Sequence, residues 1–184
     1  MTVAEAEAIA RARVSRKLAE HSGRVAAYAA DLAERWDVDR EDVLLAGWLH
    51  DICKELDAAA MLARARALGL PIGPVEAARP TQLLHAPLAA AELGGRGLSQ
   101  ACLEAIACHT TGRAGMGPAA RCLYVADAAE PGRSYQGVER LRELAVADLD
   151  AAVAESAGQT LMHLVHRGAP IHPSSVELYN ELHL

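Results

Sequence analysis

The sequence contains no phenylalanine, and aromatic residues make up only 3% of its 184 residues. Because apolar residues still reach 52%, the core must be built from Leu, Ala, Val and Ile. Ala and Leu favour helices, and the small alanine side chain lets helices approach closely. Alternating patterns typical of β-strands are absent. We therefore expect an all-α helical bundle that forms a single domain over residues 1–184.

Long apolar runs, paired cysteines and excess positive charge are also missing. No run reaches the ~18 apolar residues that a membrane span needs, and the acidic start of the sequence argues against a secretory signal. The four cysteines form no CxxC pair, which argues against a structural zinc site and favours a reduced, cytoplasmic protein. The net charge of −6 disfavours binding to a nucleic acid polymer, because such binding needs clustered Lys and Arg. For an anionic substrate, bound metal ions are one source of local positive charge.

Turn and capping residues divide the sequence into successive helices. Asp39 and Ser99 are good N-caps. The Gly- and Pro-rich segment 69–80 predicts a loop, and Gly94 is expected to end a helix as its C′ residue. The expected helices cover residues 21–36, 41–51, 58–68, 81–93 (or 85–93), 99–109, 118–129, 138–147, 149–167 and 174–182.

Four histidines and two aspartates occur in an order typical of a two-metal site. They are His21, the adjacent pair His50 and Asp51, His85, His109 and Asp127. Each gap between them suits one or two helices and a turn, so we expect the ligands to come from different helices around a shared pocket. Six such ligands can hold two divalent ions and leave positions open for water.

Each of these residues also has an ordinary structural interpretation. A single histidine on a helix is more often a core or surface residue than a metal ligand. His163, His166, His172 and His183 stay in this structural class. The pair His50-Asp51 is a stronger signal, because it ends an apolar helix where buried charge needs a partner. Asp127 also follows an apolar run, and its alternative is a salt bridge to Arg121 or Arg133.

Two segments that follow ligands are suited to phosphate. Residues 110–113 come directly after His109 and offer two hydroxyls, a glycine and a guanidinium, and residues 130–133 follow Asp127 in a similar way. The substrate-binding candidates are Arg24, Thr110, Thr111, Gly112, Arg113 and Arg133, and Lys54 is a further catalytic candidate. The alternatives are two ordinary surface turns, with Arg24 and Lys54 solvated or paired with glutamates.

His21, the His50-Asp51 doublet and Asp127 match the core pattern of the HD-domain metal-dependent phosphohydrolases. Further segments narrow the match: HDICKEL (50–56), LLHAP (83–87), HTTGRAGM (109–116), VADAAEPGR (125–133) and HPSSVELYNEL (172–182). From about residue 16 onward, the sequence resembles the bacterial HD-domain symmetrical bis(5′-nucleosyl)-tetraphosphatases. The resemblance implies an all-α HD-domain bundle and two divalent ions, iron in that family, with manganese, cobalt or zinc as alternatives. It also implies cleavage of diadenosine tetraphosphate into two ADP.

The same resemblance assigns roles to residues. One ion would be held by His21, His50, Asp51 and Asp127, and the other by Asp51, His85 and His109, with Asp51 shared. A hydroxide held between the ions would attack a β-phosphorus and expel ADP. The implied catalytic residues are Asp51, Lys54, Arg113 and Arg133, of which the last three would stabilise the leaving charge.

Two other functions remain open at this point. One is an HD-domain phosphohydrolase that acts on mononucleotides, and the other is a non-catalytic nucleotide-sensing protein. Product analysis distinguishes them. The sequence does not fix the metal, the preferred base or the oligomeric state, for which a homodimer is one alternative.

Overall fold

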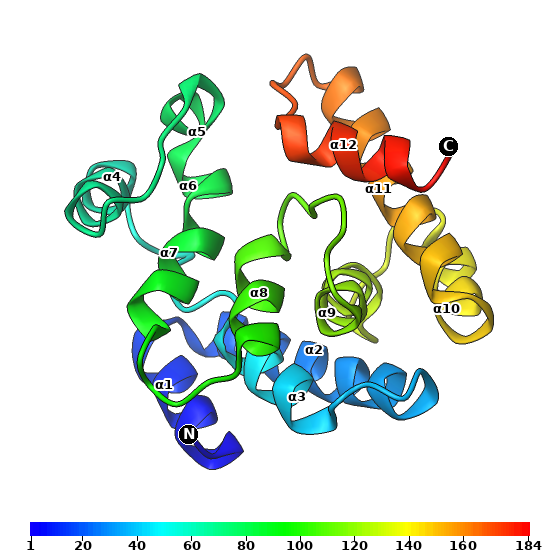
Figure 1. Ribbon diagram of the computed structural model, residues 1–184, viewed down its shortest axis with the longest axis horizontal. Coiled ribbons are helices and arrows are strands. Elements are labelled where there is room, and N and C mark those ends of the chain that lie inside the picture. Colours follow the sequence, from blue (N-terminus) through cyan, green and yellow to red (C-terminus); the bar gives the residue numbers. More distant parts are fainter.

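The computed structural model describes residues 1–184 and contains twelve helices and no strand (Figure 1). The helices are α1 (Val3–Arg13), α2 (Arg16–Arg35), α3 (Arg40–Leu49), α4 (Ala58–Ala67), α5 (Pro74–Ala78), α6 (Pro80–Leu83), α7 (His85–Leu93), α8 (Gln100–Cys108), α9 (Pro118–Ala129), α10 (Val138–Ala147), α11 (Leu149–His166) and α12 (Pro173–Glu181). The all-α prediction is therefore confirmed. No helix combines the length and the apolar character needed to cross a membrane.

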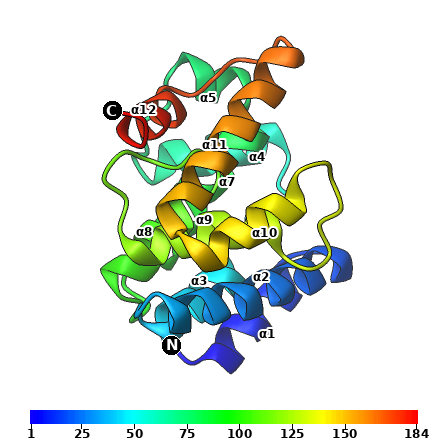
Figure 2. The same ribbon diagram turned by 90° about the vertical axis from the view of Figure 1, so that its right-hand side faces the viewer.

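Helices α2, α3, α8 and α9 form the centre of the molecule. Helix α3 packs against α2, α8 and α9, and α9 also contacts α2 and α8. Along the vertical direction that both views share, α1 to α3 lie at one end, α5 and α12 lie at the other, and α8 and α9 lie between them (Figures 1 and 2). Helix α11 packs against α9, α10 and α12, so it borders the same central helices from another side.

Small side chains allow the central helices to approach closely. A Cβ atom added to Gly47 of α3 would overlap the Cα atom of Ala26 in α2. Alanines such as Ala26, Ala29 and Ala33 are buried along this contact, as the scarcity of aromatic residues predicts. One hydrophobic cluster extends from Ala6 in α1 to Leu178 in α12.

Most predicted helices are present, and the differences have local causes. The unpredicted helix α1 begins with a capping box, in which Thr2 and Glu5 bond each other's backbone N–H. Within the predicted loop 69–80, Pro74 occupies the first turn of α5. Pro80 starts α6, which ends at Leu83, so α7 runs over His85–Leu93 and begins at the later of the two expected starts. Because proline lacks a backbone N–H, it fits the first turn of each short helix.

Gly94 ends α7 as predicted, but it is the C-cap residue of that helix and not its C′ residue. Gly94 caps α7 with a φ of −53°, and the next residue, Gly95, takes the positive φ of 77°. The reversal that the Gly-Gly pair permits therefore falls on the second glycine.

Candidate metal centre

The ends of three helices converge on the candidate metal centre. His50 is the C-cap of α3, Asp51 follows it in a turn, and His109 is the C-cap of α8. Asp127 lies in the last turn of α9. Helix C-termini carry partial negative charge, which favours bound cations. Because α3 ends at Leu49, the neighbouring residues His50 and Asp51 can face one site.

The remaining two ligands, His21 and His85, come from α2 and α7. His21 lies on α2, and its Nε2 atom is 3.0 Å from Oδ1 of Asp127. His85 is the first residue of α7, and its Nε2 atom is 3.2 Å from Oδ1 of Asp51. The Nε2 atom of His109 is 3.3 Å from the same oxygen. The fold thus brings all six predicted ligands to one place.

Backbone carbonyls orient three of the four imidazole rings. The Nδ1–H groups of His50, His85 and His109 donate to the carbonyl oxygens of Gly47, Thr81 and Ile106, at 2.8, 3.2 and 2.8 Å. Since a carbonyl oxygen only accepts hydrogen bonds, the proton must lie on Nδ1. The lone pair of each Nε2 atom then faces the cluster, which is the arrangement that a metal-binding histidine needs.

A buried carboxylate orients the fourth ring. Oε1 of Glu130 accepts a hydrogen bond of 3.1 Å from Nδ1 of His21, which leaves Nε2 of that ring facing Asp127. Glu130 is only 1% exposed, and it also accepts hydrogen bonds from the Arg24 guanidinium and from the backbone N–H of Gly132. Burial raises the pKa of Glu130, but the bonds from Arg24, Gly132 and His21 lower it to about 2. Glu130 is therefore a charged partner of His21 at neutral pH.

Sequence reasoning missed the role of Glu130. The segment that it begins, 130–133, was interpreted as a turn that binds phosphate. In the fold, Glu130 instead turns back to a helix more than a hundred residues earlier in the chain. The one available signal was a glutamate directly after an apolar helix, a position where a buried charge requires partners.

Asp51 lies between two groups of ligands. Its Oδ1 atom faces His85 and His109, while its Oδ2 atom lies 3.5 Å from Nε2 of His50. Two sets of atoms lie close enough to hold an ion: one from His21, His50 and Asp127, and one from His50, Asp51 and His109.

The cluster contains polar atoms that lack partners within the protein. Nε2 of His50 and Oδ1 of Asp51 are buried without a hydrogen bond. Nε2 of His85 and Nε2 of His109 lie 3.0 Å apart, and with both protons on Nδ1 these atoms are two facing lone pairs. A buried polar atom without a partner is costly, and a cation would satisfy Nε2 of His50 and Oδ1 of Asp51 and would also relieve the repulsion between the two facing lone pairs. Nitrogen and carboxylate oxygen donors suit a divalent transition metal, so the residues fit such an ion.

Burial and neighbouring groups together shift the pKa values of several ligands. Burial lowers the pKa of His85 to about 4 and also lowers that of His109. Burial raises the pKa of Asp51, but the His50 charge and the adjacent imidazoles bring it well below its usual range. These three residues are thus deprotonated at neutral pH, as metal ligands must be. For His50, burial lowers the pKa, but the Asp51 charge raises it above its usual value.

Two cationic side chains reach the cluster. Arg133 donates from Nη2 to Oδ1 of Asp127 at 2.7 Å and from Nε to the Asp127 carbonyl at 2.8 Å. The salt bridge considered as an alternative for Asp127 is therefore present beside the ligand cluster. The Nζ atom of Lys54 lies 2.9 Å from Nε2 of His85 and 3.4 Å from Oδ1 of Asp51.

The other predicted substrate residues are placed differently. Arg24 shares a side of α2 with His21, and its guanidinium is paired with Glu130. Arg113 pairs with Glu104 of α8 and has a half-exposed side chain. The two Gly-Arg turns that looked equivalent in the sequence therefore differ in the structure.

In the segment that follows His109, Thr110 borders the ligand cluster, whereas Gly112 packs under α12. The Thr110 hydroxyl lies 3.1 Å from Nε2 of His85, so it borders the cluster. The Thr111 hydroxyl donates to the carbonyl of Gly112. Gly112 has a φ of 62°, and an added Cβ there would overlap the Leu178 side chain. This glycine is therefore required by a turn packed under α12.

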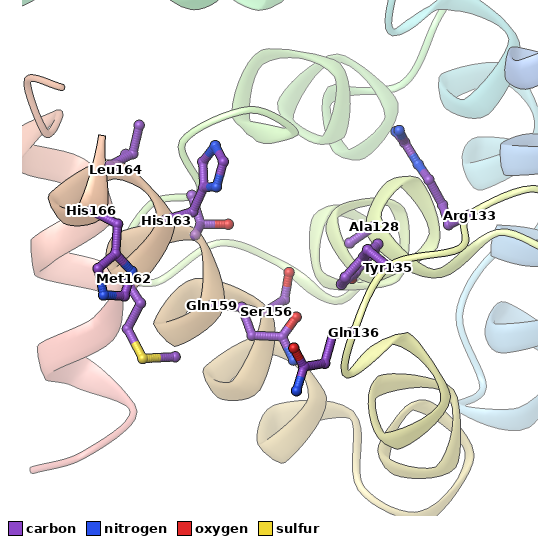
Figure 3. A pocket seen from close by; sticks show the side chains of 11 residues that line it. Ala128, Arg133, Tyr135, Gln136, Ser156, Gln159, Met162, His163, Leu164 and His166 are labelled. Atoms are coloured by element: carbon purple, nitrogen blue, oxygen red, sulfur yellow. The ribbon is translucent and has the colours of Figure 1, made fainter. Parts of the chain in front are cut away.

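A cavity of about 140 Å³ opens at the cluster, and we call it the central cavity. It is lined by Lys54, His109 and Asp127 together with residues of α11. Two further cavities share lining residues with it. The larger, of about 830 Å³, shares Ala128, Ser156 and Thr160 (Figure 3). The smaller, of about 140 Å³, shares Thr110 and Thr160. Arg113 lines none of the three.

Of the four histidines assigned to the structural class, His172 caps α12 and bonds Oε1 of Glu76 at 2.9 Å. His163 and His166 line the larger cavity, and His183 stacks on Tyr179. None of the four belongs to the ligand cluster.

The chain is similar to a known protein family, to named relatives and to a solved structure. The HD domain family matches residues 18–132. A Staphylococcus aureus protein named "Bis(5'-nucleosyl)-tetraphosphatase, symmetrical" is 33% identical over 184 residues, which cover 98% of this chain and 94% of the relative. A Bacillus subtilis protein of the same name is 32% identical over 161 residues, covering 84% and 83%. A crystal structure from Clostridium acetobutylicum, described as a predicted HD superfamily hydrolase involved in NAD metabolism, superposes with a TM-score of 0.92 at 28% identity, covering 99% and 97%.

Proposed function

Because the chain belongs to the HD-domain family of symmetrical bis(5′-nucleosyl)-tetraphosphatases, we propose that it hydrolyses diadenosine tetraphosphate into two molecules of ADP. The observation that carries this proposal is the convergence of six ligand side chains in one cluster, with Asp51 between two ligand groups. A passive nucleotide-sensing protein has no evident need for unpartnered lone pairs at such a place.

We assign two divalent ions to this centre, with iron as the first candidate metal. His21, His50, Asp51 and Asp127 would hold one ion, and Asp51, His85 and His109 would hold the other. The two-sided position of Asp51 supports its role as the shared ligand. Bound there, such ions would neutralise phosphate oxygens and lower the pKa of a water molecule toward about 7.

The protein's own cations would hold the polyphosphate beside this centre. Arg133 is fixed by its two hydrogen bonds to Asp127, and its side chain remains 41% exposed, so it can also contact a phosphate. Lys54 is exposed to a similar degree and lines the central cavity. Because ADP is a good leaving group, these two charges can stabilise it without a dedicated general acid.

We do not assign Arg24 or Arg113 to direct contact with the scissile phosphates. Arg24 is a positioning residue, because it holds Glu130 and, through Glu130, the ring of His21. Arg113 would have to leave Glu104 and turn toward the site to contact a substrate. The charge at the scissile phosphates is therefore assigned to Arg133 and Lys54.

The two arginines provide a matched test of this assignment. We expect Arg133→Ala to lower kcat/KM by about 30- to 1000-fold, the effect of losing about 2–4 kcal/mol of transition-state stabilisation. Arg113→Ala, a matched change in the other Gly-Arg turn, should leave kcat/KM within about threefold. Equal losses in the two variants would contradict the assignment.

The function itself is tested by product analysis. Metal-loaded protein is incubated with diadenosine tetraphosphate, and the nucleotides are separated by anion-exchange chromatography. Two ADP are expected, whereas AMP plus ATP would contradict symmetrical cleavage. Phosphate release from mononucleotides without turnover of the dinucleotide would favour the mononucleotide phosphatase. Absence of turnover with iron, manganese or cobalt would favour the sensing protein.

A further inference from the structure

One arginine of α10 holds the backbone of the turn that follows α9. The guanidinium of Arg142 donates from Nε to the carbonyl oxygen of Ala129 at 2.8 Å. Its Nη2 atom donates to the carbonyl oxygens of Glu130 and Arg133, at 2.9 and 2.8 Å. The acceptors are thus the last residue of α9 and the first and last residues of the turn 130–133. Because the last carbonyls of a helix have no partner inside it and carry partial negative charge, a guanidinium is well suited to this place.

Two of these three acceptor residues also place their side chains at the metal centre. The Glu130 carboxylate orients the ring of His21 through Nδ1. The Arg133 guanidinium bonds the Asp127 carboxylate. Within the turn, one backbone hydrogen bond joins the N–H of Arg133 to the carbonyl of Glu130 at 2.9 Å. Arg142 therefore holds the main chain of the same two residues whose side chains reach metal ligands.

Arg142 has little capacity left to bind a substrate. A guanidinium carries five N–H donors, of which three are used on the carbonyl oxygens. Nη1 donates a fourth to Oε1 of Glu139. The Glu139 side chain is 79% exposed, so this ion pair contributes little, and the carbonyl contacts are the main task of the arginine.

Helix α10 gives Arg142 a fixed base. At the other end of α10, Trp36 of α2 donates from Nε1 to the carbonyl oxygen of Ala145 at 2.9 Å. The helix is therefore tied to α2, which carries His21, and through Arg142 to the end of α9, which carries Asp127. It connects the two helices that supply ligands to the same ion.

We propose that Arg142 is a positioning residue for the ion held by His21 and Asp127, and that it acts through the backbone of the turn 130–133. Without its hydrogen bonds the turn is free to shift, and its side chains lose the observed contacts with the His21 ring and the Asp127 carboxylate. The ion beside His85 has no ligand bonded to this turn, so its affinity does not depend on Arg142. This inference rests on the two metal positions of the proposed function.

The test measures the affinity of each metal position in Arg142→Met, which keeps an unbranched side chain but removes every donor. Metal content is determined across a series of chelator-buffered metal concentrations. Loss of an outer partner of a metal ligand typically lowers metal affinity by about 10- to 100-fold. Arg142→Met should weaken the His21 position by about 10-fold, the lower end of this range, because it acts through Glu130 and not on a ligand directly. The position beside His85 should stay within about twofold of the unchanged protein.

A double-mutant cycle identifies the route of this effect. Glu130→Gln removes the contact through which Arg142 acts on His21. Changes within one hydrogen-bond network are not additive. The combined variant should therefore lose less affinity at the His21 position than the product of the two single fold losses.

Two further variants separate positioning from general loosening of the fold. Arg121→Met is the matched control, because the Arg121 side chain is 20% exposed against 24% for Arg142 and also donates to a carbonyl, that of Met116 at 3.1 Å. It bonds no metal ligand, so both metal affinities should be unchanged. Arg142→Lys keeps the charge and serves if Arg142→Met does not fold. Because an ammonium group donates from a single atom, it cannot replace both Nε and Nη2, and the His21 position should still weaken, by less than in Arg142→Met.

Four outcomes would overturn the inference. These are an unchanged affinity of the His21 position in the Arg142 variants, equal losses at the two metal positions, an equal loss in Arg121→Met, and full additivity with Glu130→Gln. None of these measurements uses a nucleotide. Failure of the inference is therefore distinguishable from failure of the proposed function, which product analysis of the unchanged protein would reveal as the absence of ADP.

Discussion

Replacement of Glu130 by glutamine should weaken one metal position and spare the other. Both carboxylate oxygens of Glu130 accept two hydrogen bonds: Oε1 from His21 and Arg24, and Oε2 from Arg24 and Gly132. An amide has only one oxygen, so in either orientation its NH₂ group faces groups that also donate. Either orientation places two donors against each other, which displaces the side chain and weakens its hold on the His21 ring.

The expected size of this effect follows from the role of the contact. Loss of a partner that orients a metal ligand typically lowers metal affinity by about 10- to 100-fold, or about 1.4–2.8 kcal/mol. The loss should fall on the ion held by His21 and Asp127. The position formed by Asp51, His85 and His109 contains no atom bonded to Glu130 and should keep its affinity.

Metal content measured at a series of chelator-buffered metal concentrations tests this prediction. The unchanged protein should bind two equivalents, and Glu130→Gln should retain one at concentrations where the other is lost. Glu104→Gln is the matched control, because Glu104 also accepts from an arginine, Arg113, and from a backbone N–H, but away from the cluster. Binding of both ions by Glu130→Gln at the affinity of the unchanged protein would refute the reasoning.

The remaining predictions concern the shared ligand, acid stability and helix packing. Asp51→Ala should lose both ions and all activity, whereas His85→Ala should chiefly deplete one ion; elemental analysis that finds both ions in Asp51→Ala would exclude the shared role. Glu92 is paired with arginines of α1 and α4, and although burial raises its pKa, these arginines lower it below its ordinary value of 4.5. The stabilisation by Glu92 is therefore present above pH 4.5 and lost as the pH falls through the lower folded-state pKa. Glu92→Gln should lower the free energy of unfolding by about 1–3 kcal/mol at pH 7. In urea titrations this difference should shrink below pH 4.5. Gly47→Ala should lower the free energy of unfolding by about 1–3 kcal/mol, because its Cβ would overlap α2. Gly158→Ala on α11 is its control and should be neutral or stabilising, since an added Cβ there meets only an ordinary contact at 3.6 Å, and a destabilisation equal to that of Gly47→Ala would contradict the packing argument.

Local signals in the sequence were sufficient for most of the fold. Asp39 and Ser99 cap α3 and α8 as predicted, because a capping side chain acts on a backbone N–H only a few residues away. The convergence of the six ligands was also predictable from their order, once the chain was compared with the HD-domain pattern. The short helix α5 lies within the predicted loop 69–80, because Pro and Gly signal both loops and helix starts.

Partnerships across long stretches of sequence were beyond local reasoning. The spacing of His21 and Arg24 predicts that they share a side of α2, but not that Glu130 lies opposite both. Likewise, the turns that contain Arg113 and Arg133 have similar sequences, and only the packing of α8 gives Arg113 its partner Glu104. The iron assignment, the single-domain boundaries, a homodimer and the cytoplasmic location stay predictions.

The four imidazole rings differ in how easily mutation can disturb the groups that orient them. His50, His85 and His109 are steered by main-chain oxygens within four residues of themselves, so substitution of neighbouring side chains cannot remove their guides as long as the helices form. His21 depends on one distant side chain that a single nucleotide change could replace. Mutation of Glu130 can therefore change the metal affinity at His21 without replacing a ligand. The metal affinity beside His85 should be less sensitive to substitutions of neighbouring side chains. Selection that adjusts metal preference in this chain would act first through the side of the centre that Glu130 supports.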